Sequence, residues 1–142
     1  MLRISQFDRV TILAVISGIT LAILAIFFSL LLTNVQMLDF YALLLTFIAG
    51  VYLGFLLLDG QLKKQNLFLE IGAMGITVIF SLLGLWYSEL FLIVGYFFHG
   101  IWDIIHHPRG VQTKIPEKYS LFCLIFDWIV AIFLIITLFI LI

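Results

Sequence analysis

The chain has 142 residues, of which 65% are hydrophobic and 11% are charged, and its formal net charge is −1. Soluble domains are about half apolar and about a quarter charged, so this composition excludes an ordinary soluble domain and indicates an integral membrane protein. No basic cluster is long enough to indicate a nucleic-acid partner. The length suits a single transmembrane helical bundle over residues 1–142, without a separate soluble domain.

Five apolar segments of sufficient length follow one another along the chain. A helix needs about 20 residues to cross about 30 Å of hydrocarbon. Lipid offers the backbone no hydrogen-bonding partner, so each span is expected to be helical. The sequence therefore predicts an all-α, polytopic membrane protein, a bundle of five transmembrane helices at about residues 10–32, 38–58, 66–86, 88–107 and 119–142. The third break is short, so spans three and four should form a close hairpin.

Positive charges predict the orientation of this bundle. All seven lysines and arginines either precede span one or lie in the connections that follow spans two and four. In a five-span arrangement these positions share one side of the membrane. Cytoplasmic loops carry the excess of Lys and Arg, so we expect a cytoplasmic N-terminus and an external C-terminus. The predicted location is multi-pass in a bacterial plasma membrane or a thylakoid.

Two pairs of glycines lie in spans two and three. They are Gly50 with Gly54, and Gly72 with Gly75. Small residues let helix backbones approach closely. The pairs leave three interpretations open, which are chance in a chain with ten glycines, ordinary packing inside the bundle, and a face for a homo-oligomer.

Ionisable residues within the spans gather toward the predicted cytoplasmic side. Most come from span four, in the stretch YFFHGIWDIIHHPRG, and the others from spans two, three and five: His99, Asp103, His106, His107, Asp59, Glu70 and Asp127. A charge inside the bilayer is costly, so such residues usually face the bundle interior and find partners there. We therefore expect one polar cavity that opens toward the cytoplasm.

Helix geometry places the residues of span four on one face. At about 100° per residue, His99, Asp103 and His106 lie within an arc of about 60°, and His107 lies about 40° from Asp103. Asp103 is four residues from both His99 and His107, so it forms a chelating pair with either. Imidazole with carboxylate suits divalent zinc, iron or manganese. The predicted metal ligands are His99, Asp103, His106, His107 and Asp127.

Two carboxylates are candidate general bases. A metal ion makes its bound water more acidic, and Asp127 or Glu70 on a facing helix is predicted to accept the proton. Glu70 also has a purely structural interpretation, in which it caps the start of span three near the interface. Cys123, one turn before Asp127, is either a soft metal ligand or a core residue.

Structural interpretations also remain open for the histidines. His106 and His107 end a span at the interface, where basic side chains normally reach lipid headgroups. His99 is a core histidine under this interpretation, hydrogen-bonded to a carbonyl or to Asp127. Trp102 is expected to be an interfacial or packing aromatic.

The runs HGIWDIIHHP and FCLIFDW resemble a family of small multi-pass membrane proteins of unknown function. The family shares an H-x-x-W-D-x-x-H-H block followed by a Cys-to-Asp stretch, and the matching positions here are His99, Trp102, Asp103, His106, His107, Cys123 and Asp127. The resemblance covers roughly residues 90–130, with Glu70 as a further fitting acid, and it implies a shared site without a known reaction.

Two families of His-rich membrane metalloenzymes show a more distant likeness. The D-x-x-H-H run is similar to the H-x-x-H-H element of membrane fatty-acid hydroxylases and desaturases, but those iron enzymes need many more histidines than the three present here. Membrane ceramidase-like zinc hydrolases spread their histidines over several helices, whereas all three histidines of this chain fall in one span.

Three classes of function fit these features. We predict a metal-dependent enzyme, a hydrolase or an oxidoreductase, that acts on a lipid-like substrate near the cytoplasmic leaflet. One alternative is a non-catalytic accessory subunit of a larger membrane complex, in which a histidine ligates a haem or a chlorophyll. The other is a conduit for metal ions or protons, against which the almost uncharged outer half of the bundle argues.

Overall fold

The structure, a computed structural model, describes residues 2–60, 63–106, 114–116 and 118–141. Within these ranges the chain forms five α-helices and a short π-helical segment: α1 (Leu2–Ser29), α2 (Asn34–Leu58), α3 (Lys64–Trp86), α4 (Glu89–His106), α5 (Tyr119–Ile136) and η1 (Thr137–Leu141). All five α-helices are long and apolar enough to cross a membrane. The predicted all-α architecture of five membrane-spanning helices is therefore confirmed.

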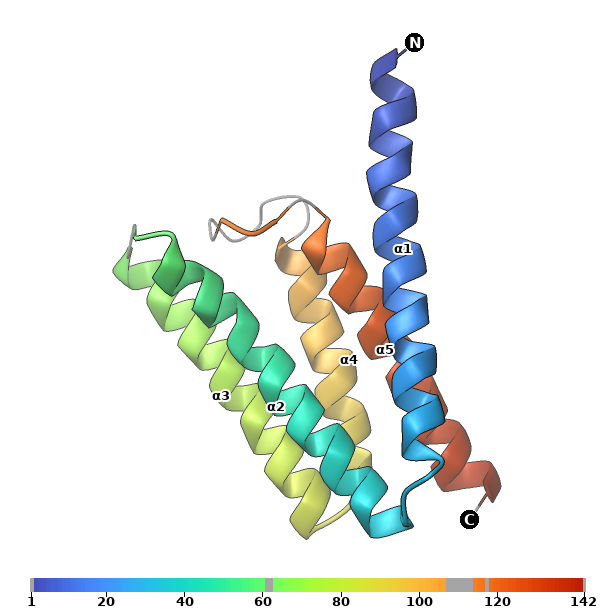
Figure 1. Cartoon of the computed structure of the whole chain (residues 1–142). Coiled ribbons are helices and arrows are strands. Elements are labelled where there is room, and N and C mark those ends of the chain that lie inside the picture. Colours follow the sequence, from blue (N-terminus) through green and yellow to red (C-terminus); the bar gives the residue numbers. More distant parts are fainter. Residues whose placement is uncertain (1, 61–62, 107–113, 117, 142) are drawn as a thin grey trace.

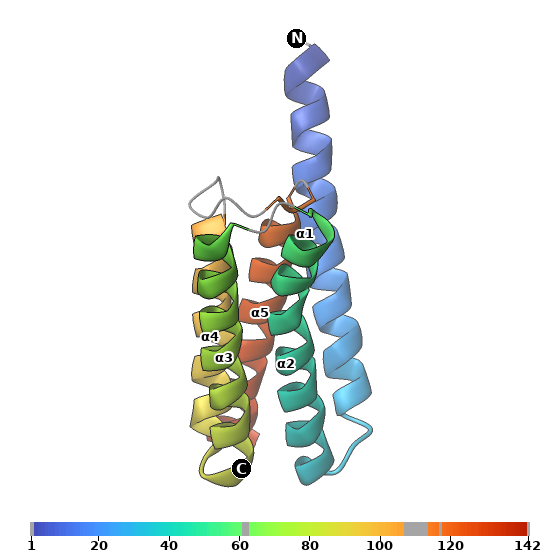
Figure 2. The same ribbon diagram turned by 90° about the vertical axis from the view of Figure 1, so that its left-hand side faces the viewer.

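Successive helices run in opposite directions along one bundle (Figure 1). The N-terminus and the ends that lead from α2 to α3 and from α4 to α5 lie at one end of the bundle, and the C-terminus lies at the other (Figures 1 and 2). We call the first the upper end, as it is drawn. Every described cationic side chain belongs to this end: Arg9, Lys63, Lys64, Lys114 and Lys118. Which side of the membrane this end faces stays a prediction.

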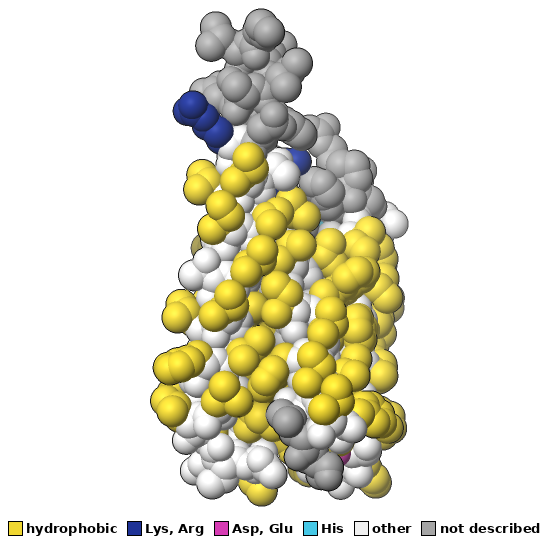
Figure 3. Space-filling view, turned by 90° about the vertical axis from the view of Figure 1, so that its right-hand side faces the viewer, with side chains coloured by type: hydrophobic (Ala, Val, Ile, Leu, Met, Phe, Trp, Pro, Cys, Tyr) yellow, Lys and Arg dark blue, Asp and Glu magenta, His cyan; other side chains and the backbone are white. Residues whose placement is uncertain are grey.

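The surface of the bundle suits a lipid environment. Hydrophobic side chains cover the face shown in Figure 3 along most of its length, and Lys and Arg gather only near its upper end. Many large apolar side chains are exposed, among them Leu31 at 73%, Phe47 at 73% and Phe68 at 79%. Exposed apolar surface on this scale marks a membrane contact rather than a water-facing surface.

Helix α2 begins earlier than the apolar run predicts. The span was expected from residue 38, but Thr33 and Gln36 form a capping box that starts the helix at Asn34. The Thr33 side chain accepts from the Gln36 backbone N–H at 3.4 Å, and the Gln36 Oε1 accepts from the Thr33 backbone N–H at 3.1 Å. These bonds satisfy donors that a helix start leaves unpaired.

Glycine permits close packing at four points between helices. A Cβ on Gly84 would lie 2.8 Å from the Leu92 Cβ, so its absence allows the tight α3–α4 hairpin that the short break predicts. Likewise, a Cβ on Gly18 of α1 would lie 2.8 Å from the Phe122 carbonyl oxygen of α5. Such close approach of backbones is typical of helix packing in membranes.

The glycine pairs of α2 and α3 do not serve this purpose. A Cβ on any of the four would meet nothing within 4 Å: Gly50, Gly54, Gly72 and Gly75. The structure therefore does not support close packing inside the chain as the reason for these pairs. A homo-oligomer face stays a prediction.

The lower half of the bundle has a mainly apolar core. Three tyrosines are buried in the bundle, and two of them, Tyr41 and Tyr96, lie in this half. Their hydroxyl groups each find a hydrogen-bond partner. The Tyr41 hydroxyl donates to Ser29 Oγ at 3.0 Å, and the Tyr96 hydroxyl donates to the Tyr41 carbonyl at 2.8 Å. Helix α4 packs against α3 on one side and α5 on the other, with α2 across from it. This central position puts the polar face of α4 inside the bundle.

Candidate metal centre

His99, Asp103 and Asp127 form a buried group between α4 and α5. Their exposed fractions are 2%, 0% and 0% respectively. The His99 Nδ1 atom lies 2.7 Å from Asp127 Oδ2 and 3.8 Å from Asp103 Oδ2. Each residue offers one ligand-type atom, and these atoms all lie within 4.8 Å of one another. The structure thus brings together three of the five ligands that the sequence predicts.

One polar atom on each of these residues is left without a described partner. His99 Nε2, Asp103 Oδ2 and Asp127 Oδ1 are buried, and no atom in the described part of the chain hydrogen-bonds to them. Buried polar atoms are nearly always paired, because leaving them unpaired is costly. Two neighbouring carboxylates in an apolar interior also require bound protons or a cation to balance their charge. The group therefore calls for a proton or a cation between its two carboxylates.

Tyr52 of α2 completes one side of the group. Its hydroxyl donates to Asp103 Oδ1 at 2.6 Å, and the residue is 1% exposed. Tyr52 is not among the site residues that the sequence predicts. The available signal was a tyrosine about two turns inside a span, where its hydroxyl needs a partner away from the headgroups.

A second polar cluster, formed by Glu70, Trp102 and His106, joins α3 to α4. His106 Nε2 lies 2.7 Å from Glu70 Oε1, and Trp102 Nε1 donates to Glu70 Oε2 at 3.3 Å. His106 Nδ1 lies 3.0 Å from the Trp102 carbonyl. Because a carbonyl only accepts, His106 Nδ1 is the donor in this contact.

This second cluster differs from what the sequence analysis expects of its members. Both ring nitrogens of His106 are engaged, so His106 does not join the His99 group, and its metal ligation stays a prediction without structural support. Glu70 is 2% exposed and paired with His106, which places it inside the bundle rather than at an interfacial cap. Trp102 holds the Glu70 carboxylate in addition to packing between helices.

The remaining predicted residues lie elsewhere. His107 falls outside the described residues. Cys123 is buried at 3% exposure but contributes no atom to the His99 group, which favours its interpretation as a core residue. Asp59 ends α2, where Lys114 Nζ lies 4.0 Å from Asp59 Oδ1.

Most of the residues that were expected to line an open polar cavity are buried in the described part of the chain. An open hollow of about 320 Å³ lies at the upper end, lined by Phe55, Leu58, Asp59, Lys114, Ile115 and Pro116. Aromatic rings separate it from the buried group: Phe55 packs against Tyr119 at 5.1 Å, and Tyr119 packs against Tyr52 at 5.9 Å, measured between ring centroids. Whether a polar cavity opens toward the cytoplasm stays a prediction.

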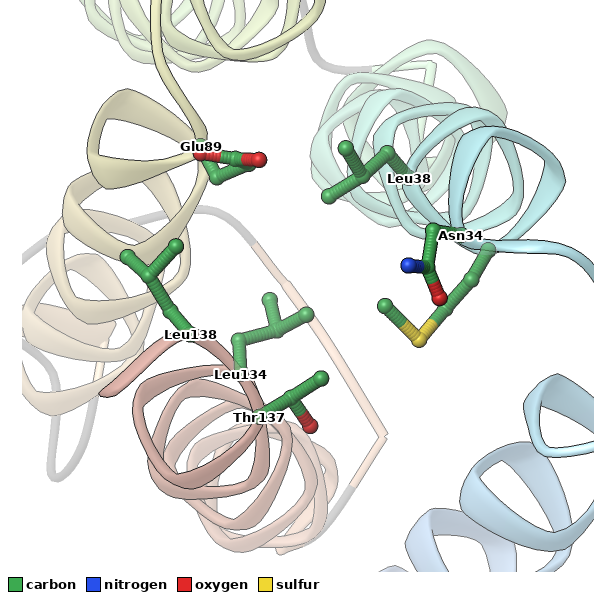
Figure 4. Close-up of a pocket in the computed structure, with 7 residues that line it drawn as sticks. Asn34, Leu38, Glu89, Leu134, Thr137 and Leu138 are labelled. Atoms are coloured by element: carbon green, nitrogen blue, oxygen red, sulfur yellow. The ribbon is translucent and has the colours of Figure 1, made fainter. Parts of the chain in front are cut away.

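A small cavity at the lower end is unrelated to this group. It has a volume of about 30 Å³ and is lined by residues of α2, α4, α5 and η1: Asn34, Met37, Leu38, Glu89, Leu134, Thr137 and Leu138. Figure 4 shows the side chains that line it. Glu89 is separated from Asp103 by roughly 20 Å along α4 at about 1.5 Å per residue. This cavity therefore does not serve the candidate metal centre.

Residues 13–138 match the family described as "Family of unknown function (DUF6010)", and because this match covers most of the chain, the protein belongs to that family. The membership agrees with the expected resemblance to an uncharacterised family. No curated protein and no solved structure matches the chain. The family description carries no activity, so a function has to be argued from the buried groups themselves.

Proposed function

We propose that this protein binds a divalent metal ion at His99, Asp103 and Asp127 within the membrane and uses it to act on a lipid-like substrate. The observation that carries the proposal is the convergence of three buried ligand-type atoms, one on each of these residues, all within 4.8 Å of one another. A divalent cation held there balances the charge of the two buried carboxylates. Imidazole and carboxylate together suit zinc, iron or manganese.

The spacing of the group is close to that of a metal site. His99 Nδ1 and Asp127 Oδ2 are 2.7 Å apart, which is a hydrogen-bond distance. Two ligands of a tetrahedral zinc ion with bonds of about 2.0–2.1 Å lie about 3.3 Å apart. An ion held through His99 Nδ1 would take the place of the proton in this hydrogen bond and would require the two side chains to move slightly apart.

The same residues supply a reaction when a metal is bound. A divalent ion held by His99, Asp103 and Asp127 would supply Lewis-acid chemistry and an activated water for an acyl or phosphoryl bond. Of the two predicted bases, Asp127 lies next to the proposed ion, where one of its oxygens would ligate and the other would accept the proton. Glu70 already accepts from His106 and Trp102. A lipid-like substrate is supported by the burial of the group among membrane-spanning helices near the upper end of the bundle.

Elemental analysis of the detergent-purified protein tests the metal site. We expect stoichiometric zinc, iron or manganese in the wild type and its loss in His99→Ala and Asp103→Ala. Glu89→Gln is the matched control, because it changes a carboxylate of α4 at the far end of the helix and should retain the metal. A wild type that stays metal-free after reconstitution with each ion contradicts the proposal. Turnover of a defined lipid by the metal-loaded protein then tests the enzymatic part.

A second candidate function, proton transfer, is favoured by one observation. Both histidine–carboxylate pairs, His99 with Asp127 and His106 with Glu70, have the 2.7 Å separation of a proton-sharing hydrogen bond. Proton flux in proteoliposomes that contain a pH-sensitive dye tests this candidate. The accessory-subunit hypothesis stays a prediction, and a visible absorption band from haem or chlorophyll in the purified protein would support it.

A further inference from the structure

We infer that Tyr52 is a positioning residue of the candidate metal centre, which selects the oxygen of Asp103 that faces His99. This inference rests on the proposed metal site. The Tyr52 hydroxyl donates to Asp103 Oδ1 at 2.6 Å, whereas Asp103 Oδ2 is unpaired and lies 3.8 Å from His99 Nδ1. The two oxygens of one carboxylate are thus distinguished by a contact from another helix.

The hydroxyl has this effect because a carboxylate is otherwise free to rotate about its last bond. A hydrogen bond from O–H to a carboxylate at about 2.5–2.7 Å is of the strong, charge-assisted kind. It holds Asp103 Oδ1 on the side of α2 and leaves Oδ2 on the side of α5, where Asp127 lies. Partners that orient a metal ligand in this way are needed for full metal affinity.

The ring of Tyr52 is itself held from two sides. The His106 ring stacks on it with centroids 4.1 Å apart and an interplanar angle of 17°, and the Tyr119 ring meets it edge-on at 5.9 Å. His106 in turn is fixed by Glu70. The cluster of Glu70, Trp102 and His106 therefore acts through Tyr52, as a support for the residue that orients Asp103.

The chain provides a matched control in Tyr41. Tyr41 is 0% exposed and its hydroxyl donates to Ser29 Oγ at 3.0 Å, in the lower half of the bundle. Tyr41→Phe and Tyr52→Phe each remove one buried, hydrogen-bonded hydroxyl and keep the ring. A merely structural role predicts similar effects of the two changes, whereas a positioning role predicts that only Tyr52→Phe alters metal binding.

Titration of the metal-free, detergent-purified full chain with Co²⁺ alone tests the inference. The absorption bands of bound Co²⁺ report the geometry of its ligands. We expect Tyr52→Phe to weaken Co²⁺ binding about 10- to 100-fold, in the range found for lost orienting partners, and to shift the bands. Tyr41→Phe should bind like the wild type. His106→Gln, which keeps the Tyr52 hydroxyl but removes the stacked ring, should cause a smaller loss, and it provides a second readout if Tyr52→Phe folds poorly.

The outcomes separate the inference from the proposed function. If wild type binds Co²⁺, His99→Ala does not, and both Tyr52→Phe and His106→Gln bind like Tyr41→Phe, the positioning role is overturned and the metal site stands. If the wild type binds no Co²⁺, the proposed metal site is overturned, and the inference fails with it.

Discussion

His99 Nδ1 and Asp127 Oδ2 lie 2.7 Å apart, joining α4 to α5 through two side chains that are almost completely buried. A buried histidine–carboxylate pair fixes the rotation of both helices, because a small turn of either one leaves a polar group without its partner. Removing one member of a buried ionic pair typically costs about 3–5 kcal/mol. The pair therefore matters for the assembly of the bundle as well as for any ion that the group binds.

Asp127→Asn should abolish stoichiometric metal binding while the protein still folds. The amide oxygen can accept from His99 Nδ1, so the hydrogen bond is kept, but the negative charge that attracts a cation is lost. We expect a loss of about 1–3 kcal/mol in the free energy of unfolding, since the amide also brings donors that need partners. Elemental analysis and denaturant unfolding in detergent check both parts. Asp39→Asn, at an exposed carboxylate of α2, is the control, and a metal-replete Asp127→Asn variant contradicts the assigned ligand.

Glu70 and His106 should be energetically coupled. Glu70→Ala and His106→Ala are each expected to cost about 3–5 kcal/mol, because each leaves a buried partner unpaired. The double variant should cost less than the sum, with a coupling energy of about 0.5–3 kcal/mol. A double-mutant cycle on the free energy of unfolding measures this coupling. The pair of Asp59 and Lys114 is the control, because Lys114 has an 82% exposed side chain and should show almost no coupling.

Gly100→Ala should destabilise the α4–α5 contact. A Cβ at this position would lie 2.6 Å from Trp128 Cδ1, so the indole must move away from α4. Overpacking of this kind typically costs about 1–3 kcal/mol. Gly75→Ala is the control, since a Cβ there meets nothing within 4 Å. Thermal unfolding in detergent distinguishes the two, and equal midpoints for both variants would show that the packing at Gly100 is looser than described.

The orientation of the bundle can be tested by labelling single cysteines in a Cys123→Ser background. Lys63→Cys lies where α2 leads into α3, and Tyr87→Cys lies where α3 leads into α4, at opposite ends of the bundle. The one-sided distribution of Lys and Arg predicts a cytoplasmic Lys63. In inverted vesicles a membrane-impermeant maleimide should label Lys63→Cys and leave Tyr87→Cys unlabelled. The reverse result would place the N-terminus outside.

The spans are predictable because apolar length is a property of the sequence alone. The start of α2 was predicted too late, since Asn34 and Gln36 are polar and only their capping geometry reveals a helix. His99 and Asp103 were predicted as neighbours because four residues make about one helical turn. The sequence also predicts that these two residues meet Asp127, because all three lie at a similar depth in adjacent spans.

Other contacts of the site could not be predicted from spacing. Whether Tyr52 faces Asp103 depends on how α2 is rotated about its axis, and several rotations bury an equally apolar surface. The same holds for α3, where Glu70 faces His106 instead of the His99 group. Polar side chains in a span are thus predicted to find partners, but the choice of partner is decided by packing.

The hairpin of α3 and α4 has a consequence for the biogenesis of this protein. Helix α4 is the least hydropathic of the five spans, and it carries His99, Asp103 and His106. Because only residues 87 and 88 separate α3 from α4, we expect the two helices to insert as one hairpin, in which Glu70 and His106 face each other. The least hydropathic span then enters the bilayer with a partner for His106 beside it, and Asp127 of α5 completes the His99 group.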